Sequence, residues 1–126
     1  MSDFNFISPS FIVSDLQDSL SFYTGKLGFE VWHTSPEKDP YFAMIGRGPV
    51  SLMLKGNSQP SPNHTRYEWG AWDAYISVPD PDTLYEEYLA AGVIFNQPLK
   101  NTTDNLRGFE VADVDGYILF FGRPNT

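Results

Sequence analysis

The chain has 126 residues, which suffices for one domain with a hydrophobic core and is short for two. Hydrophobic residues make up 41% and charged residues 19%, a balance typical of a folded globular protein. The net charge of −8 excludes nucleic acid and anionic membrane surfaces as expected partners, and it attracts cationic small molecules at long range. The alternative is that the acidity serves solubility alone.

The sequence also lacks several features that would point to other classes of protein. It contains no cysteine, which excludes disulfides, thiolate metal sites and a cysteine nucleophile. The first residues show no basic segment followed by an apolar core, so no signal peptide is predicted. No apolar run approaches the roughly 20 residues that span a bilayer. We therefore expect a cytoplasmic protein.

The first half of the chain predicts a strand, a helix and three further strands. A strand is expected over residues 6–13, with Pro9 near its opening. Asp15 is suited to cap the following helix, and Gly28 ends it. The remaining strands are expected over residues 29–33, 41–45 and 50–54, with a turn at 46–49 that makes the last two a hairpin.

The same order of elements then restarts after a polar linker at about residues 57–68. A strand is expected over residues 72–78, before a helix with Asp80 as its cap and Pro81 as its first residue. The later elements are a helix end at Gly92, a strand starting at Val93, strands over 107–112 and 117–121, and an Asp115-Gly116 turn.

This internal repeat predicts the fold class. Residues 11–15 correspond to residues 76–80, and Leu27-Gly28 corresponds to Ala91-Gly92. Each helix needs a sheet on which to bury its apolar stripe. We expect an α+β fold in one domain, residues 1–126. Two βαβββ modules, about 4–56 and 69–124, form an open, curved mixed sheet around a cleft, with the helices outside.

The order and spacing of several segments carry a resemblance to a known family. They are residues 13–16, 21–23, 27–29, 82–85, 90–93 and 109–117. Together they resemble the glyoxalase/bleomycin resistance protein/dioxygenase (vicinal-oxygen-chelate) superfamily, over nearly the whole chain. The ending at residues 121–124 is similar to that of the bleomycin-resistance-type members. Val114 departs from the pattern, since proline is common at that position. The resemblance also implies a homodimer.

The resemblance places the metal-ligand positions of the superfamily at Ser8, Asp73 and Phe120. Serine is a poor neutral ligand and phenylalanine has no donor atom, so we expect no metal, no cofactor and no catalytic residue. His33 and His64 lie at none of these three positions. The alternative is a divalent-metal-dependent lyase or dioxygenase whose ligands lie elsewhere. A metal-free enzyme that uses Asp73, Glu110 or Asp113 is disfavoured. Asp113 suits a structural role in a turn, and Glu110 suits the solvent-exposed face of a strand.

The remaining expectation is a binding cleft lined by aromatic side chains, which make up 16% of the chain. Side-chain alternation directs Tyr75 and Ser77 toward the cleft and Ile76 toward the helix. The predicted ligand-binding residues are Trp32, Tyr41, Phe42, Met44, Met53, Trp69, Trp72, Asp73, Tyr75, Leu106 and Phe109.

We predict a metal-independent protein of the bleomycin-resistance type that sequesters a flat, cationic compound. In this interpretation Trp69 and Trp72 clamp a flat ring and Asp73 contacts a cationic group. The alternative is that Trp72 caps the core and Trp69 packs at a dimer interface, and core packing is equally open for Phe42, Met44 and Met53. A scaffold that senses or acts on a metabolite unrelated to any drug is a third hypothesis.

Overall fold

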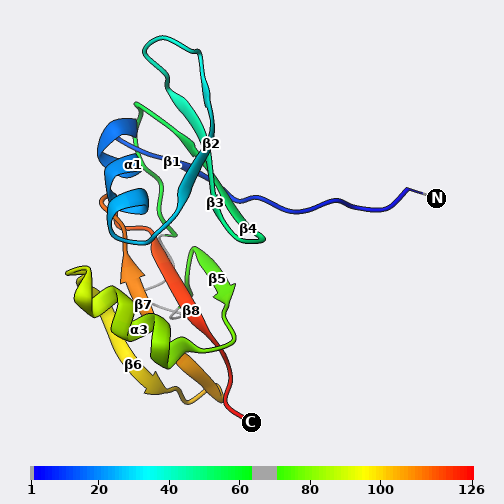
Figure 1. Ribbon diagram of the computed structural model, residues 1–126, viewed down its shortest axis with the longest axis vertical. Helices are drawn as coiled ribbons and strands as arrows, with labels where there is room; N and C mark the ends of the chain where they lie inside the picture. Colours follow the sequence, from blue (N-terminus) through cyan, green and yellow to red (C-terminus); the bar gives the residue numbers. More distant parts are fainter. Residues whose placement is uncertain (1, 64–70) are drawn as a thin grey trace.

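The computed structural model describes residues 2–63 and 71–126. It contains two four-stranded mixed sheets, each with one helix, and both helices lie on the same side of the chain (Figure 1). The first module consists of β1 (Ser10–Ile12), α1 (Leu16–Gly25), β2 (Glu30–Ser35), β3 (Phe42–Arg47) and β4 (Val50–Lys55). The second consists of β5 (Ala74–Ser77), α3 (Pro81–Ala90), β6 (Phe95–Asn101), β7 (Leu106–Ala112) and β8 (Ile118–Pro124). The predicted α+β fold class is confirmed.

The two sheets have the same topology. Their strand orders are β1-β4-β3-β2 and β5-β8-β7-β6, and in each the first and last strands of the module pair in parallel. Parallel pairing requires a crossover connection, which begins with the helix of each module. Ser10 lies opposite Met53 in the first sheet, and Tyr75 lies opposite Phe120 in the second. These two pairs are equivalent positions of the repeat.

The helix ends follow the predicted chemistry. The Asp15 side chain accepts a hydrogen bond from the backbone N–H of Asp18, and the Asp80 side chain accepts one from Thr83. Gly28 and Gly92 follow the helices with φ of 77° and 78°, a conformation that favours glycine. Both helices are 10 residues long. Over residues 2–63 and 71–126, no helix combines the length and the apolar character that crossing a membrane requires.

Several element boundaries differ from the expected ones. β1 begins only after Pro9, which has no N–H to donate to a sheet, although its carbonyl accepts from the Met53 N–H. β3 continues through Arg47, so the expected turn over residues 46–49 shortens to Gly48-Pro49, where Gly48 has a φ of 58°. β6 begins at Phe95 rather than at Val93.

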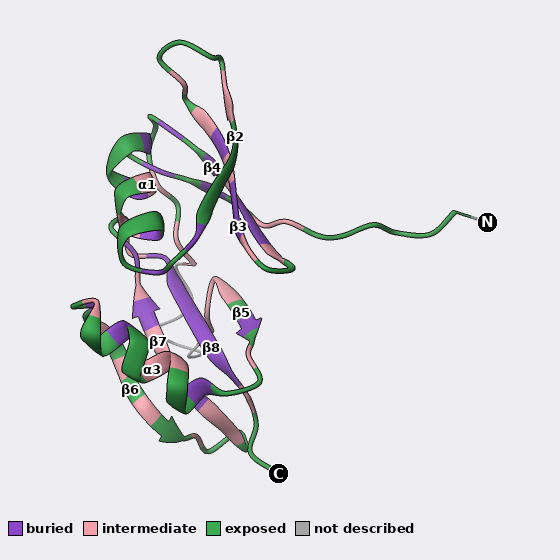
Figure 2. Cartoon of the chain, in the orientation of Figure 1, coloured by how far each residue is buried: buried purple, intermediate pink, exposed green. Residues whose placement is uncertain are grey.

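The hydrophobic core lies between the helices and the sheets. Buried residues concentrate in the inner strands β3, β4, β7 and β8, whereas β2 is largely exposed (Figure 2). Tyr23 of α1 and Tyr88 of α3 are the largest buried side chains of their helices. Phe109 and Phe121 pack against Tyr88 with edge-on ring contacts. The core is therefore rich in rings, and each tyrosine brings a hydroxyl that needs a partner.

Three buried or half-buried tyrosine hydroxyls connect the two modules. Tyr23 donates to Asp113 Oδ2 over 2.6 Å, Tyr88 donates to the Leu27 carbonyl over 2.9 Å, and Tyr117 donates to the Ile12 carbonyl over 2.7 Å. Asp113 also accepts from the backbone N–H groups of residues 115 and 117. Burial raises the pKa of the Asp113 carboxyl even though these hydrogen bonds act to lower it. The junction is thus a polar network set within apolar packing.

Substituting Tyr23→Phe should lower the free energy of unfolding by about 1–3 kcal/mol, because it leaves the buried Asp113 carboxyl without one of its donors. Urea unfolding followed by circular dichroism measures this change. Tyr85→Phe is the matched control, since the Tyr85 hydroxyl forms no hydrogen bond within the described part of the chain. An equal effect of the two substitutions would contradict the role given to the Tyr23 hydroxyl.

The same variant should show a characteristic pH dependence. The pKa of Asp113 is raised above its ordinary value of 3.8. The stability that the protonated Asp113 carboxyl contributes is therefore present below pH 3.8 and is lost as pH rises through the pKa of the folded state. Removing the Tyr23 hydrogen bond raises this pKa further. The stability difference between parent and Tyr23→Phe should therefore be larger at about pH 7 than at about pH 4. A difference that is constant over this range would refute the expectation.

Candidate functional site

Three aromatic rings form a cluster on the side of the second sheet that faces away from α3. The Trp72 ring stacks on Phe120 with centroids 4.5 Å apart, and the Tyr75 ring stacks on the same phenylalanine at 5.5 Å. Trp72 and Tyr75 are themselves 5.6 Å apart. We call Trp72, Tyr75 and Phe120 the aromatic face. It brings together two of the predicted ligand-binding residues, Trp72 and Tyr75.

Glycines explain how the central ring lies against the sheet. Phe120 and Gly122 alternate onto the same side of β8, and Gly108 of β7 lies opposite Gly122. A Cβ atom at Gly108 would come within 2.6 Å of the Phe120 ring, and one at Gly122 within 2.5 Å. The ring thus occupies space that two side chains would otherwise fill. Phe120 is fully buried and Tyr75 is 41% exposed, so Tyr75 offers the accessible ring.

Glu110 places a carboxylate next to the aromatic face, opposite Phe120 in the sheet register. Its Oε2 accepts from Trp72 Nε1 over 3.1 Å, and its Oε1 accepts from Asn96 Nδ2 over 2.6 Å. Both donors are neutral. Among the residues that the structure describes, no lysine or arginine forms an ion pair with Glu110. The result is a negative charge that is held in position and that no cationic side chain of the described residues compensates.

Other predicted ligand-binding residues lie on the first sheet. Met44 and Met53 lie opposite each other, on the side of the sheet away from α1, and Phe42 shares their side of β3. The Trp32 ring occupies the space that a side chain at Gly46 would take. Tyr41, just before β3, is 52% exposed. No ring contact joins this group to the aromatic face within residues 2–63 and 71–126, so the predicted residues occupy two separate sheet faces.

Phe109 and Leu106 are the predicted residues of β7. Phe109 is fully buried in the core, where it packs against Tyr85 and Phe121 on the helix side of β7. Leu106 lies on the same side of β7 as Glu110, as alternation requires. Trp69 lies outside the described residues.

Asp73 is turned toward the backbone. Its Oδ1 accepts from the Asn63 N–H over 2.6 Å and its Oδ2 from the Ile118 N–H over 2.8 Å, so both oxygens fasten neighbouring segments together. The other two positions that the family resemblance assigns to metal ligands are Ser8 and Phe120, and the Phe120 ring is stacked in the aromatic face. These three residues do not form a donor set for a divalent ion. In the described residues, no three His, Cys, Asp or Glu side chains are grouped closely enough to hold one.

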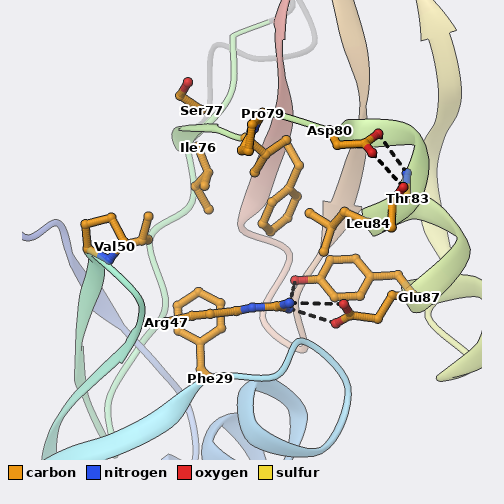
Figure 3. Close-up of a pocket in the computed structure, with 14 residues that line it drawn as sticks. Phe29, Arg47, Val50, Ile76, Ser77, Pro79, Asp80, Thr83, Leu84 and Glu87 are labelled. Carbon is orange, nitrogen blue, oxygen red and sulfur yellow. Dashed lines mark hydrogen bonds and ion pairs between the residues drawn. The ribbon is translucent and has the colours of Figure 1, made fainter.

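A pocket of about 390 Å³ opens between the two modules, on the helix side of the sheets (Figure 3). Pro49 and Val50 contribute the wall from the first module, while β5 and α3 contribute the walls from the second. Most of the lining is apolar. Arg47 lies along its base and points toward Glu87 (Figure 3). Sequence reasoning gave this region no role, because its residues are far apart in the chain.

The ion pair at the base of the pocket is bidentate. Arg47 Nη1 lies 2.8 Å from Glu87 Oε2, and Nη2 lies 3.0 Å from Oε1. The Glu87 hydrogen bonds raise the pKa of Arg47, and Arg47 lowers the pKa of Glu87 in turn, so both side chains are charged. Arg47 Nη1 also donates to the Leu27 carbonyl over 3.0 Å. A Cβ at Gly28 would lie 2.9 Å from that nitrogen, which adds a second reason for glycine there.

Tyr88 closes the same end of the pocket. Its hydroxyl lies 3.4 Å from Arg47 Nη1 and donates to the Leu27 carbonyl. Burial raises the pKa of Tyr88 to about 12, so the hydroxyl keeps its proton at neutral pH. The base of the pocket is thus a closed set of hydrogen bonds drawn from both modules.

Comparison with known proteins identifies the family. The sequence profile of the Glyoxalase/Bleomycin resistance protein/Dioxygenase superfamily matches residues 5–121. No curated protein sequence shows a significant match to the chain.

Among solved structures, the bleomycin-binding protein of the bleomycin-producing Streptomyces verticillus, in complex with copper(II)-bleomycin, is 27% identical, with a TM-score of 0.71 over 96% of this chain and 97% of that one. TioX from Micromonospora sp. ML1 is 20% identical, with a TM-score of 0.76 over 95% and 98%. A glyoxalase/bleomycin resistance protein/dioxygenase from Alicyclobacillus acidocaldarius is 17% identical, with a TM-score of 0.78 over 97% and 92%. The family profile covers nearly the whole chain, and the chain belongs to the Glyoxalase/Bleomycin resistance protein/Dioxygenase superfamily.

Proposed function

We propose that this protein binds a flat, cationic small molecule on the aromatic face and sequesters it without a metal ion, as a binding protein of the bleomycin-resistance type. The observation that carries the proposal is the Glu110 carboxylate, which lies beside stacked rings and has no cationic partner within residues 2–63 and 71–126. An uncompensated charge next to aromatic rings suits a ligand that brings the opposite charge on a flat ring system.

The binding chemistry follows from the two parts of the site. A cation above an aromatic ring gains about 0.5–2 kcal/mol, and a stacked ring pair adds about 0.5–1.5 kcal/mol beyond the burial of apolar surface. A ligand N–H that reaches Glu110 would form a charge-assisted hydrogen bond, which is shorter and stronger than a neutral one. The net charge of −8 raises the rate of encounter with a cation.

The bleomycin-binding protein of Streptomyces verticillus supports the choice of ligand class, because it matches nearly the full length of this chain. A bleomycin-like compound is therefore the first ligand to test, and sequestration of such a compound would confer antibiotic resistance. The function needs no bond to be made or broken and hence no catalytic residue. A metabolite of similar shape and charge would satisfy the same site.

We also propose that the protein acts as a homodimer. Residues 2–7 run away from both sheets (Figure 1), and this segment carries Phe4, Phe6 and Ile7, which are 101%, 67% and 87% exposed. Three exposed apolar side chains on one extended segment favour burial against a second copy of the chain. The first-module group around Met44 and Met53 then offers adaptable apolar surface beside the subunit boundary.

Substituting Glu110→Gln should lower the affinity for 1-methylquinolinium at least about fivefold, because the variant keeps the side-chain shape and loses the charge. The affinity for uncharged 1-methylnaphthalene, which has nearly the same shape, should stay within about twofold. Isothermal titration calorimetry measures both. Glu86→Gln, an exposed residue of α3, makes the same change in net charge and serves as the control. Equal weakening by the two substitutions would show that long-range charge, rather than Glu110, selects the cation.

Bleomycin itself tests the ligand class. Metal-free bleomycin should quench tryptophan fluorescence of the parent, and Trp72→Ala should bind it at least about tenfold more weakly through loss of stacking. Unchanged binding by Trp72→Ala would place any bleomycin site away from the aromatic face.

Elemental analysis of the purified protein tests the alternative function. About one equivalent of a divalent metal would favour the lyase or dioxygenase class.

The dimer proposal predicts that a Phe4→Ser, Phe6→Ser, Ile7→Ser variant elutes as a monomer in light-scattering chromatography, whereas the parent shows twice the mass of one chain. The reason is the loss of the apolar surface that the second copy covers. Ile94→Ser is the control, because Ile94 is 85% exposed and lies outside the extended segment. A parent that is monomeric at all concentrations tested would overturn the proposal.

A further inference from the structure

We propose that the pocket between the two modules is a second ligand site, distinct from the aromatic face, and that it takes an uncharged aromatic molecule of one or two fused rings. Its volume of about 390 Å³ lies within the range of small-molecule sites in proteins. Both modules contribute side chains to it, so the site exists only when the two modules are joined.

Most of the pocket lining is apolar and firmly packed, although Ser77, Asp80 and Thr83 also line it. The Asp80 carboxylate accepts hydrogen bonds from the N–H and the hydroxyl of Thr83. Ile76 and Phe121 are 7% and 2% exposed, and they belong to the hydrophobic core. Val50 and Leu84 pack against that core from opposite sides of the pocket. Figure 3 shows Val50 and Leu84 facing each other across the space, with Ile76 between them and Phe29 at the base. Such a space is lined in advance for an apolar ligand and needs no rearrangement to accept one.

The charges at the base argue against a charged ligand. Arg47 and Glu87 satisfy each other in a bidentate pair, so the base carries no net charge. A carboxylate ligand would approach Glu87 as well as Arg47, and an ammonium ligand would meet Arg47 as well as Glu87. The net charge of the protein further disfavours anions. An uncharged ring system avoids both repulsions.

The position of Arg47 favours an aromatic ligand over an aliphatic one. Its side chain lies along the base with its end directed at Glu87 (Figure 3), so the ligand meets the planar face of the guanidinium and the methylene stem. A planar guanidinium stacks on aromatic rings, and its weak hydration makes this contact favourable. The pocket therefore combines a mostly apolar lining with the planar face of one guanidinium, whose charge Glu87 balances.

The pocket and the aromatic face share strands and use opposite sides of them. On β5, Tyr75 belongs to the aromatic face and Ile76 lines the pocket. On β8, Phe120 and Phe121 divide in the same way. Because consecutive strand residues point to opposite sides, the two sites have no lining side chain in common. The pocket can therefore be tested separately from the proposed function.

The test uses indole as the uncharged probe, with indole-3-carboxylate and tryptamine as its anionic and cationic relatives. Titrations followed by two-dimensional ¹H–¹⁵N NMR should show that indole shifts the backbone signals of Val50, Leu84 and Glu87. The two charged relatives should bind there at least about tenfold more weakly. If indole shifted the backbone signals of Trp72 and Tyr75 only, the proposal would be overturned. Equal affinity of the pocket for all three probes would overturn it as well.

Two variants that fill the pocket complete the test. Leu84→Trp from the second module and Val50→Trp from the first should each weaken indole binding at least about tenfold. Glu86→Trp, on the exposed side of the same helix, should leave it unchanged. Full-strength binding by both filling variants would refute the site. If instead either filling variant changed the oligomeric state, the pocket would be part of the interface with a second copy of the chain, and the proposal would be wrong.

Discussion

In the part of the chain that the structure describes, each sheet has a helix on one side only, and most features of the molecule depend on that constraint. Strand side chains alternate, so one half of each inner strand must be apolar for the helix, while no described helix covers the other half. In β8 the helix side holds Leu119 and Phe121, and the open side holds Phe120 and Gly122. The open side is where the fold can carry a ligand without disturbing its core.

The two modules are joined through polar atoms at the ends of apolar elements. Tyr23, Tyr88 and Tyr117 each pack a ring in or against the core and send a hydroxyl across the junction. Arg47 and Glu87 close the same junction at its surface, where their partial exposure limits what the ion pair adds to stability. Hydrogen bonds are directional, so they fix the orientation of one module relative to the other better than apolar contact alone does.

Sequence reasoning predicted the order of the elements, and it named two side chains of the aromatic face, for identifiable reasons. Asp15, Asp80 and Gly28 have local effects on the backbone, so their neighbours in the sequence suffice to interpret them. Tyr75 followed from strand alternation, once the strand was recognised. The assignment of Phe109 to the cleft ignored the same alternation, because Glu110 takes the open side of β7 and Phe109 takes the core.

The remaining site residues depend on contacts between distant parts of the chain. Arg47 and Glu87 are 40 positions apart, and nothing near either residue in the sequence indicates the other. Asp73 appeared available to a ligand, yet the Ile118 N–H, 45 positions away, takes one of its oxygens. Glu110 could be placed on the wet side of its strand, but its donors Trp72 and Asn96 become visible only in three dimensions.

The Trp32 ring over Gly46 has a consequence for how this sheet can change in evolution. All the atoms nearest to a side chain added at position 46 belong to that ring. A larger residue at 46 is therefore accommodated only after the tryptophan has been replaced or has moved away. The two positions are therefore coupled, and as long as the ring keeps this position, glycine is the residue that fits beneath it.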